Sequence, residues 1–178
     1  MFMKKFLLGV AYVLIALLVV FMGGAYTLPG EAVVERQVTI AAPPGKIFGI
    51  VSDLRRFKEF SPWAEIDPNL QYTFEGPAIG IGQKMSWSSD KAELGSGSQT
   101  VVDYQPNVRF ATTLDFGDMG DAISYFNFVP VANDTKVTWG FKSLLRNPLE
   151  RWMGLLFDRW IGADYEKGLA KLKVVAEK

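Results

Sequence analysis

The stretch Asn147–Lys178, NPLERWMGLLFDRWIGADYEKGLAKLKVVAEK, decides the fold of this chain. Asn147 is a residue type that caps helices, Pro148 suits the first helical position, and Glu150 stands where a capping box needs an acidic residue. No proline follows, so the sequence predicts one long helix of roughly 29 residues, or ~43 Å at 1.5 Å per residue. We expect the rest of the chain to be organised around this helix.

The apolar residues of this helix form two stripes instead of one. At about 100° per residue the two stripes lie more than a third of a turn apart, and Gly162 lies at the change. Because glycine tolerates a bend, the pattern predicts a kink or break at Gly162. The preferred interpretation is a core helix; the alternative is that its Trp-rich half also lines a pocket or contacts a membrane. The first stripe is Leu149, Trp152, Met153, Leu156 and Trp160, and the second is Ile161, Tyr165, Leu169, Leu172 and Ala176.

The composition excludes several kinds of active site. The chain has 178 residues with no Cys and no His. A Ser-His-Asp triad, a thiolate nucleophile, a disulfide and any metal or haem site built on Cys or His are therefore impossible. Lys plus Arg number 19 and Asp plus Glu 19, so the zero net charge argues against nucleic acid as a partner. The sequence predicts no metal site and no cofactor.

The N-terminal segment predicts a membrane span. Lys4 and Lys5 precede a stretch without charge, Phe6 to Leu28, which exceeds the ~20 residues needed to cross bilayer hydrocarbon. A cleavable signal peptide is the alternative, because Gly23-Gly24-Ala25 offers small residues, but its apolar region normally has only about 7–15 residues. An uncleaved anchor that contacts the membrane through residues 6–28 is favoured. By the positive-inside rule the N-terminus would be cytoplasmic and the globular part extracytoplasmic, on the periplasmic or outer face.

The remaining chain predicts one domain, with residues 1–30 as anchor and linker and residues 31–178 as the domain. A strand at Val33–Ala41 precedes two short helices, the second at Leu54–Phe60. Six strands with alternating apolar residues follow, separated by turn-forming residues. They cover Gln71–Glu75, Gln83–Ser88, Gln99–Tyr104, Val108–Phe116, Ala122–Val129 and Lys136–Phe141. The predicted fold class is α+β, a curved antiparallel seven-stranded sheet around the long C-terminal helix, preceded by one transmembrane helix.

Short motifs follow one another along the domain in a distinctive order. They are Ala42-Pro43-Pro44, Val51-Ser52-Asp53-Leu54, Phe60-Ser61-Pro62-Trp63, Asp67-Pro68-Asn69, Phe74-Glu75-Gly76-Pro77, Gly80-Ile81-Gly82 and, near the end, Gly162-Ala163-Asp164-Tyr165-Glu166-Lys167-Gly168-Leu169. Together, from about Val33 to Lys173, they resemble the START/SRPBCC superfamily in its polyketide cyclase/dehydrase-like branch. The resemblance implies the helix-grip fold, whose sheet wraps a C-terminal helix around a hydrophobic cavity. Its members include lipid carriers, ligand receptors and cyclases, so it implies no particular reaction.

Charged residues give no clear catalytic group. No pair of carboxylates has a spacing that fixes both at one site, so no catalytic residue is predicted. Asp158 and Asp164 lie on the terminal helix, where one could face a cavity, whereas Asp53 fits a helix cap better. Arg36 alternates with inward-facing valines and could contact a ligand carboxylate or phosphate. A structural ion pair is the preferred interpretation of Arg36.

The aromatic residues indicate an apolar pocket. Most must belong to the core, because each buries a large area. A curved sheet and one helix rarely fill their own concavity, however, so some of these residues are expected to line a mostly apolar cavity. The predicted ligand-binding residues are Trp63, Met85, Trp87, Phe116, Phe126, Trp139, Trp152 and Leu156.

Three functions are compatible with these patterns. The preferred one is a membrane-anchored domain that binds a hydrophobic or amphipathic small molecule, such as a lipid, near the bilayer. The first alternative is a cyclase or dehydratase without a metal that uses a carboxylate or Tyr as acid or base. The second is a module whose surface within Trp152–Ile161 docks onto a membrane or a partner protein. A wholly apolar cavity would favour binding, an ionisable group at its floor would favour the enzyme, and a filled interior with exposed Phe157 and Trp160 would favour docking.

Overall fold

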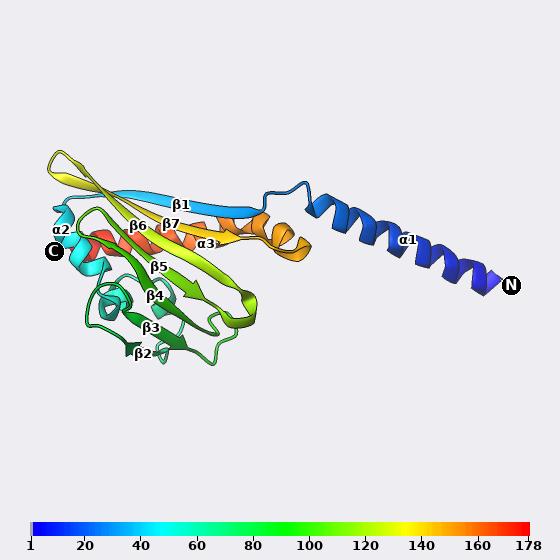
Figure 1. Cartoon of the computed structure of the whole chain (residues 1–178), viewed down its shortest axis with the longest axis horizontal. Helices are drawn as coiled ribbons and strands as arrows, with labels where there is room; N and C mark the ends of the chain where they lie inside the picture. The colour runs from blue at the N-terminus through cyan, green and yellow to red at the C-terminus, as the bar shows by residue number, and fades with distance from the viewer. Residues whose placement is uncertain (1) are drawn as a thin grey trace.

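The computed structural model describes residues 2–178 and contains one seven-stranded antiparallel sheet with a long helix against it (Figure 1). The strands are β1 (Glu31–Ile40), β2 (Gln71–Glu75), β3 (Lys84–Ser88), β4 (Ser96–Gln105), β5 (Arg109–Asp115), β6 (Asp121–Val131) and β7 (Asp134–Leu144). The α-helices are α1 (Phe2–Ala25), α2 (Pro44–Val51) and α3 (Pro148–Ala176), and the 3₁₀ turns are η1 (Leu54–Glu59), η2 (Trp63–Glu65) and η3 (Gly117–Met119). The predicted α+β helix-grip architecture is confirmed.

The sheet is a meander closed by its first strand. Its order is β1-β7-β6-β5-β4-β3-β2, so β2 to β7 are sequential neighbours and β1 pairs with the last strand. The β1–β7 ladder runs from Glu31 opposite Leu144 to Ile40 opposite Thr135. The chain between β1 and β2 must therefore cross from one edge of the sheet to the other. It does so through α2, η1 and η2, which cover the part of the inner face that α3 leaves open (Figure 1).

Helix α3 begins with the predicted capping box. The Asn147 side chain accepts a hydrogen bond from the backbone N–H of Glu150, and the Glu150 carboxylate accepts one from the backbone N–H of Asn147. The helix then packs mainly along β1. It runs unbroken from Pro148 to Ala176, so the predicted break at Gly162 is wrong, whereas the alternative of a kink there stays a prediction.

The two apolar stripes of α3 have different environments. The second-half residues Tyr165, Leu169, Leu172 and Ala176 are buried against the sheet. The first-half residues are instead exposed on the outer side of the same continuous helix. The shift from the first stripe to the second therefore marks the point where the apolar face of α3 changes from exposed to packed against the sheet. The exposed residues of the first stripe are Leu149, Met153, Leu156 and Trp160.

Helix α1 extends away from the sheet (Figure 1). Within it, Met3–Ala25 is long and apolar enough to cross a membrane, and none of its most apolar window is buried in the described structure. A signal sequence meets the same criteria of length and composition, so the anchor, its orientation and the extracytoplasmic location of the domain stay predictions.

Candidate functional site

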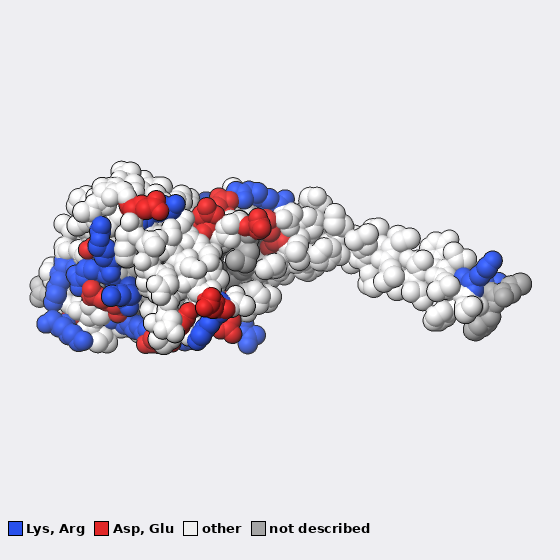
Figure 2. All heavy atoms as spheres, turned by 90° about the horizontal axis from the view of Figure 1, so that it is seen from below, with Lys and Arg blue, Asp and Glu red and all other residues white. Residues whose placement is uncertain are grey.

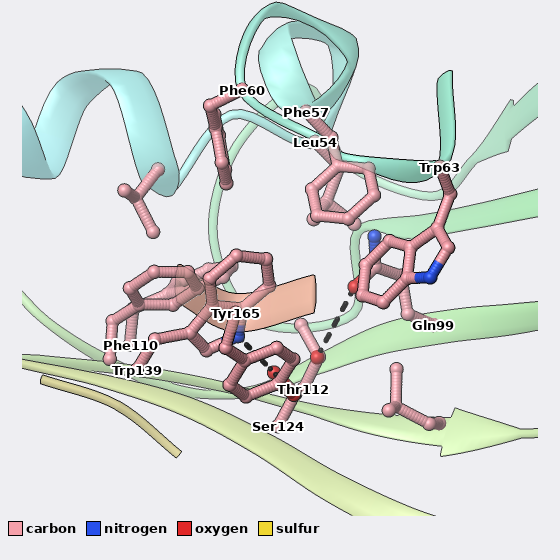
Figure 3. Close-up of a pocket in the computed structure, with 13 residues that line it drawn as sticks. Leu54, Phe57, Phe60, Trp63, Gln99, Phe110, Thr112, Ser124, Trp139 and Tyr165 are labelled. Carbon is pink, nitrogen blue, oxygen red and sulfur yellow. Dashed lines mark hydrogen bonds between the residues drawn. The ribbon is translucent and has the colours of Figure 1, made fainter. Parts of the chain in front are cut away.

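A narrow cavity of about 40 Å³ lies between the inner face of the sheet, the η1 segment and α3 (Figure 3). Cavities that hold drug-sized ligands are roughly 300–1,000 Å³, and a single water needs about 10–15 Å³. The cavity as it stands therefore accommodates only a few waters, because aromatic side chains fill most of the concavity. Its lining residues are Val51, Leu54, Phe57, Phe60, Trp63, Gln99, Phe110, Thr112, Leu114, Ser124, Phe126, Trp139 and Tyr165.

Trp139 on β7 is the centre of the aromatic wall. The Tyr165 ring on α3 stacks on one side of it at a centroid distance of 4.0 Å, and the Phe126 ring of β6 stacks at 4.8 Å. Phe60 and Trp63, which follow η1, meet the Trp139 ring edge-on at 5.9 and 6.1 Å. Stacked and edge-on pairs of this kind contribute beyond their buried area. The cavity walls are thus held by contacts between sheet, helix and the η1 region.

Four polar side chains lie among these rings. Thr112 on β5 donates to the Gln99 amide oxygen on β4 at 3.4 Å, and Trp139 Nε1 donates to Ser124 Oγ on β6 at 3.0 Å (Figure 3). Ser124 Oγ also lies 3.4 Å from the Tyr165 hydroxyl. Thr112 and Ser124 are direct cross-strand partners, so the polar groups form one row across neighbouring strands.

This polar row is buried, and two of its members, Gln99 and Thr112, are weakly bonded. Gln99, Thr112 and Ser124 are at most 8 % exposed. Strong O–H···O bonds are about 2.7–2.8 Å long, so the bonds at 3.4 Å are weak. The Gln99 amide nitrogen has the Met85 sulfur at 3.9 Å as its side-chain contact, which is a poor acceptor. Because buried polar groups destabilise a fold unless they are bonded, this row has unused hydrogen-bonding capacity beside the cavity.

Tyr165 is the one titratable residue among the described lining residues. Burial raises the pKa of its phenol well above the usual range, although the hydrogen bonds to Ser124 and Trp139 act in the opposite direction. The hydroxyl is therefore neutral at physiological pH. It can donate or accept a hydrogen bond, but it does not supply a phenolate base.

A larger cleft of about 250 Å³ opens on the other side of η1. Leu54 lines both hollows, so its side chain is part of the wall between them. The Arg55 guanidinium at the cleft lies 5.6 Å above the Phe74 ring and donates to the carbonyl of Ala78. Exposed Lys58 adds a second cation. The cleft is lined by Leu54, Arg55, Lys58, Tyr72, Phe74 and Met85.

The floor of the cleft contains a polar group without a partner. The Tyr72 hydroxyl is buried and has no hydrogen-bond partner among the residues that the structure describes. Its pKa is raised by burial, so the hydroxyl is neutral. With apolar Leu54, Phe74 and Met85 around it and two cations at its edge, the cleft has an amphipathic surface.

Local bonds hold η1 between the two hollows. The Asp53 carboxylate accepts from the backbone N–H of Arg55 at 3.0 Å, which confirms the predicted cap. Gln83, which is fully buried, accepts from the backbone N–H of Leu54 at 3.4 Å and donates to the carbonyl of Ala78 at 2.7 Å. Apart from packing, therefore, η1 is tied to the loop between β2 and β3 by few bonds.

Three of the predicted ligand-binding residues line the cavity, namely Trp63, Phe126 and Trp139. Met85 is buried and lines the cleft instead. Their role in binding stays a prediction, since no ligand is present to test it.

The other predicted residues lie elsewhere. Trp87 and Phe116 pack against each other edge-on at 5.9 Å, and Trp87 Nε1 donates to the carbonyl of Leu94. Trp152 and Leu156 lie on the first half of α3, where Leu156 is exposed and Trp152 stacks on Phe21 of α1. The structure does not bring these residues together with the cavity.

The polar row was missed by sequence reasoning. Its signal was a single polar residue within an inward-facing set of apolar ones: Thr112 stands between Phe110 and Leu114, and Ser124 between Ala122 and Phe126. Strand parity places such residues on the core face, which makes them candidates for a binding role. Only the register shows that they are neighbours.

The charged residues considered from the sequence form structural contacts. Arg36 Nε lies 2.6 Å from the Glu166 carboxylate and Nη1 lies 2.8 Å from that of Asp158, so the preferred ion-pair interpretation is confirmed. Asp164 accepts from Trp63 Nε1 at 3.1 Å and thereby orients a cavity residue. Neither Asp158 nor Asp164 belongs to the described cavity lining.

The fold and the apolar, aromatic interior define a helix-grip protein of the START/SRPBCC superfamily. More narrowly, the chain belongs to the family described as polyketide cyclase / dehydrase and lipid transport, whose model matches residues 31–177. A sequence search of curated proteins finds no match.

Solved structures show the same fold at low sequence identity. The di-domain ARO/CYC StfQ from the steffimycin biosynthetic pathway aligns with a TM-score of 0.63 and 13 % identity over 87 % of this chain and 53 % of its own length. A protein from Thermobifida fusca aligns at 0.62 and 16 % identity, covering 81 % and 92 % of the two chains. The Aha1 dimer from Colwellia psychrerythraea aligns at 0.55 and 19 % identity, covering 82 % and 96 %. At such identities these likenesses show the fold and not the function.

Proposed function

We propose that residues 31–178 bind a hydrophobic or amphipathic small molecule between the inner face of the sheet and η1, and that α1 holds this domain at a membrane. The observation that carries the proposal is the row of Gln99, Thr112 and Ser124, which is buried beside a cavity and in which Gln99 and Thr112 are only weakly hydrogen-bonded. A fold that only needed a core would gain stability from apolar residues at these positions. Polar groups kept there fit a ligand that bonds to them.

The room for such a ligand comes from the two hollows together. The cavity of about 40 Å³ is too small alone, but the cleft of about 250 Å³ is separated from it by the wall that contains Leu54. A shift of the short η1 segment would join them into a volume of about 300 Å³, the lower limit of the usual range for ligands. In the bound state η1 would be displaced and the two hollows joined. A ligand that binds only this open form would shift the equilibrium toward it.

The lining specifies the chemistry of the ligand. A flat apolar group would pack against the rings of Trp63, Phe126 and Trp139. A hydroxyl or carbonyl at its inner end would bond to Thr112 or Gln99. A polar or acidic outer end would lie in the cleft, near Arg55 and Lys58.

Binding is better supported than catalysis. The described cavity lining contains one titratable group, the neutral Tyr165 hydroxyl, and the cleft adds Arg55, Lys58 and the neutral Tyr72 hydroxyl, whereas general acid–base catalysis works best with a group whose pKa lies near the operating pH. The family includes lipid transport in its description, which fits a carrier.

Native mass spectrometry of the full chain after gentle membrane extraction tests the proposal. We expect a copurifying molecule of lipid-like size on the wild-type protein. Leu114→Trp fills the cavity and should reduce the occupied fraction at least about tenfold, the effect of ~1.4 kcal/mol. Ile123→Trp is the matched control, because Ile123 lies on the neighbouring strand and outside the lining.

A second variant covers the case in which Leu114→Trp does not fold. Thr112→Val keeps the shape of the side chain and removes its hydroxyl, so we expect occupancy to fall about three- to tenfold. A bare protein mass for the wild type, or equal occupancy in Leu114→Trp and Ile123→Trp, would contradict the proposal.

A further inference from the structure

The first half of α3 has an apolar outer face that the domain leaves uncovered. On a helical projection at about 100° per residue, Leu149, Met153, Leu156 and Trp160 form one narrow stripe. These side chains are 60, 43, 42 and 51 % exposed. Such a stripe on the surface of a helix marks an interaction site.

The stripe lies directly beside the C-terminal end of α1. The Trp152 ring stacks on Phe21 at 5.9 Å, and its Nε1 donates to the Phe21 carbonyl at 3.1 Å. Trp152 also covers Gly24, where a Cβ would meet its ring at 3.1 Å. The start of α3 therefore overlaps the last turn of α1 (Figure 1).

Arg151 strengthens this junction on its polar side. Its Nη1 donates to the carbonyls of Ala25 at 3.5 Å and Leu28 at 3.3 Å, which satisfies backbone groups at the C-terminal end of α1. Its guanidinium also lies 5.4 Å above the ring of Tyr26. The domain is consequently docked on α1 instead of hanging from a free linker.

Apolar surface is thus continuous from α1 to α3. Figure 2 shows α1 without charge between its N-terminal lysines and the globular part, where the acidic and basic residues gather. Near the junction, Arg146 pairs with Asp121 at 2.6 Å and Lys142 with Glu31 at 2.8 Å, and Arg151 bonds to backbone carbonyls. Trp152 and Tyr26, which lie at this junction, are of the residue types that gather at a membrane–water interface.

We propose that the first turns of α3, from Leu149 to Leu156, insert their apolar face into the interfacial layer of the bilayer that α1 spans. The proposal rests on the membrane anchor of the proposed function. The interfacial layer is only about 5–8 Å deep on each side of ~30 Å of hydrocarbon, so Leu149 lies deepest, Leu156, ~10 Å further along an inclined helix, lies near the outer limit, and Trp160, ~16 Å along, lies beyond it. This second contact fixes the tilt of the domain relative to the membrane.

A bilayer explains the surface better than a protein partner does. The stripe continues the apolar surface of a helix that itself matches the length of a membrane, and its start overlaps the end of that helix. A protein partner would have to reach the same level beside α1. The two occupants differ in how they shield the surface, and this difference is measurable.

Site-directed spin labelling of the full chain in phosphatidylcholine–phosphatidylglycerol nanodiscs distinguishes them, because a chain without Cys takes one label per introduced cysteine. The variants are Leu149→Cys, Met153→Cys and Leu156→Cys on the stripe. Val174→Cys, which is 58 % exposed on the second half of α3, is the matched control, and Leu14→Cys reports on α1. Collision rates with lipid-soluble oxygen and with a water-soluble nickel chelate are measured for each label.

We expect the stripe labels to be at least fivefold less accessible to the nickel chelate than the Val174→Cys label, with shielding decreasing from residue 149 to residue 156. Access to oxygen should remain high. Nickel access equal to that at position 174, with a shielded label at position 14, overturns the second contact and leaves the anchor intact. Stripe labels that are shielded from both oxygen and the nickel chelate would overturn the membrane contact and indicate that a protein partner covers the stripe. An accessible label at position 14 overturns it together with the anchor.

Discussion

Arg36 Nη2 on β1 lies so close to Gly162 on α3 that a Cβ on residue 162 would stand 2.0 Å from it. The guanidinium cannot easily move aside, because it donates to Glu166, to both the carboxylate and the carbonyl of Asp158, and to the carbonyl of Glu35. The absence of a Cβ at this position therefore makes room for the Arg36 side chain of the neighbouring strand.

Gly162→Ala tests this relationship. Replacing a helical glycine by alanine normally stabilises a helix by about 1 kcal/mol. Here the methyl group would displace Arg36 from its ion pairs, so we expect the free energy of unfolding to fall by about 1–2 kcal/mol. A double-mutant cycle compares the free energies of unfolding in urea of the wild type, Gly162→Ala, Arg36→Ala and the double variant. Because the clash is absent without the Arg36 side chain, the double variant should be more stable than Arg36→Ala alone by about 1 kcal/mol, and additive losses would refute the steric explanation.

Ser124→Ala tests the polar row. Without the Ser124 hydroxyl, the buried Trp139 Nε1 loses its acceptor. We expect the free energy of unfolding to fall by about 1–3 kcal/mol. Ser143→Ala is the control, because Ser143 donates to the Asp121 carbonyl at an exposed position and should change stability by less than about 0.5 kcal/mol. Similar losses for both variants in urea unfolding would argue against a special role of Ser124.

Leu54→Ala tests the wall between cavity and cleft. Leu54 is 1 % exposed, so its truncation should lower the free energy of unfolding by about 2–4 kcal/mol. It should also join the two hollows and keep or raise the bound fraction in native mass spectra. Leu172→Ala removes an equally buried side chain outside both linings and should lose stability without any gain in bound ligand. If Leu54→Ala lost the ligand entirely, the wall would have to be part of the binding surface.

Tyr125 predicts a change of stability at alkaline pH. Burial, and then the hydrogen bond that its hydroxyl donates to Glu35 at 2.6 Å, raise the pKa of Tyr125 from 10.0 to about 12. Above pH 10 the phenol of Tyr125 ionises in the unfolded chain but stays neutral in the folded one. The contribution of this pKa difference to the free energy of unfolding is therefore complete below pH 10 and is lost as the pH rises through 12. Urea midpoints between about pH 8 and pH 12 should therefore fall more steeply for the wild type than for Tyr125→Phe. Parallel curves would show that Tyr125 does not contribute.

Local sequence was sufficient for the elements and their order. The Asn147–Glu150 capping box predicted the start of α3, and alternation with turn residues predicted six strands that the structure contains at nearly the same bounds. These features depend on the chemistry of a few neighbouring residues, such as orphan N–H groups at a helix end or the two faces of a strand. The absence of Cys and His likewise restricts the chemistry open to this chain through composition alone.

The candidate site was less predictable because it depends on register and on what each face contacts. Parity placed Trp63, Phe126 and Trp139 near one another, but it could not show that Thr112 and Ser124 pair across strands or that η1 divides the concavity. Trp152 was expected at the pocket because it lies on an apolar stripe. Its actual neighbour, Phe21, is 131 positions away in sequence.

By itself, then, the sequence determined the antiparallel sheet, the long terminal helix and the apolar N-terminal segment, because period, capping and composition are local properties. Only the tertiary structure decided that the two stripes of α3 face different surroundings, that Gly162 makes room for Arg36, and that the interior is nearly filled with a polar row at its centre. The physical reason is that a stripe records which side of a helix is apolar, whereas the partner of that side is set by packing between segments far apart in the chain.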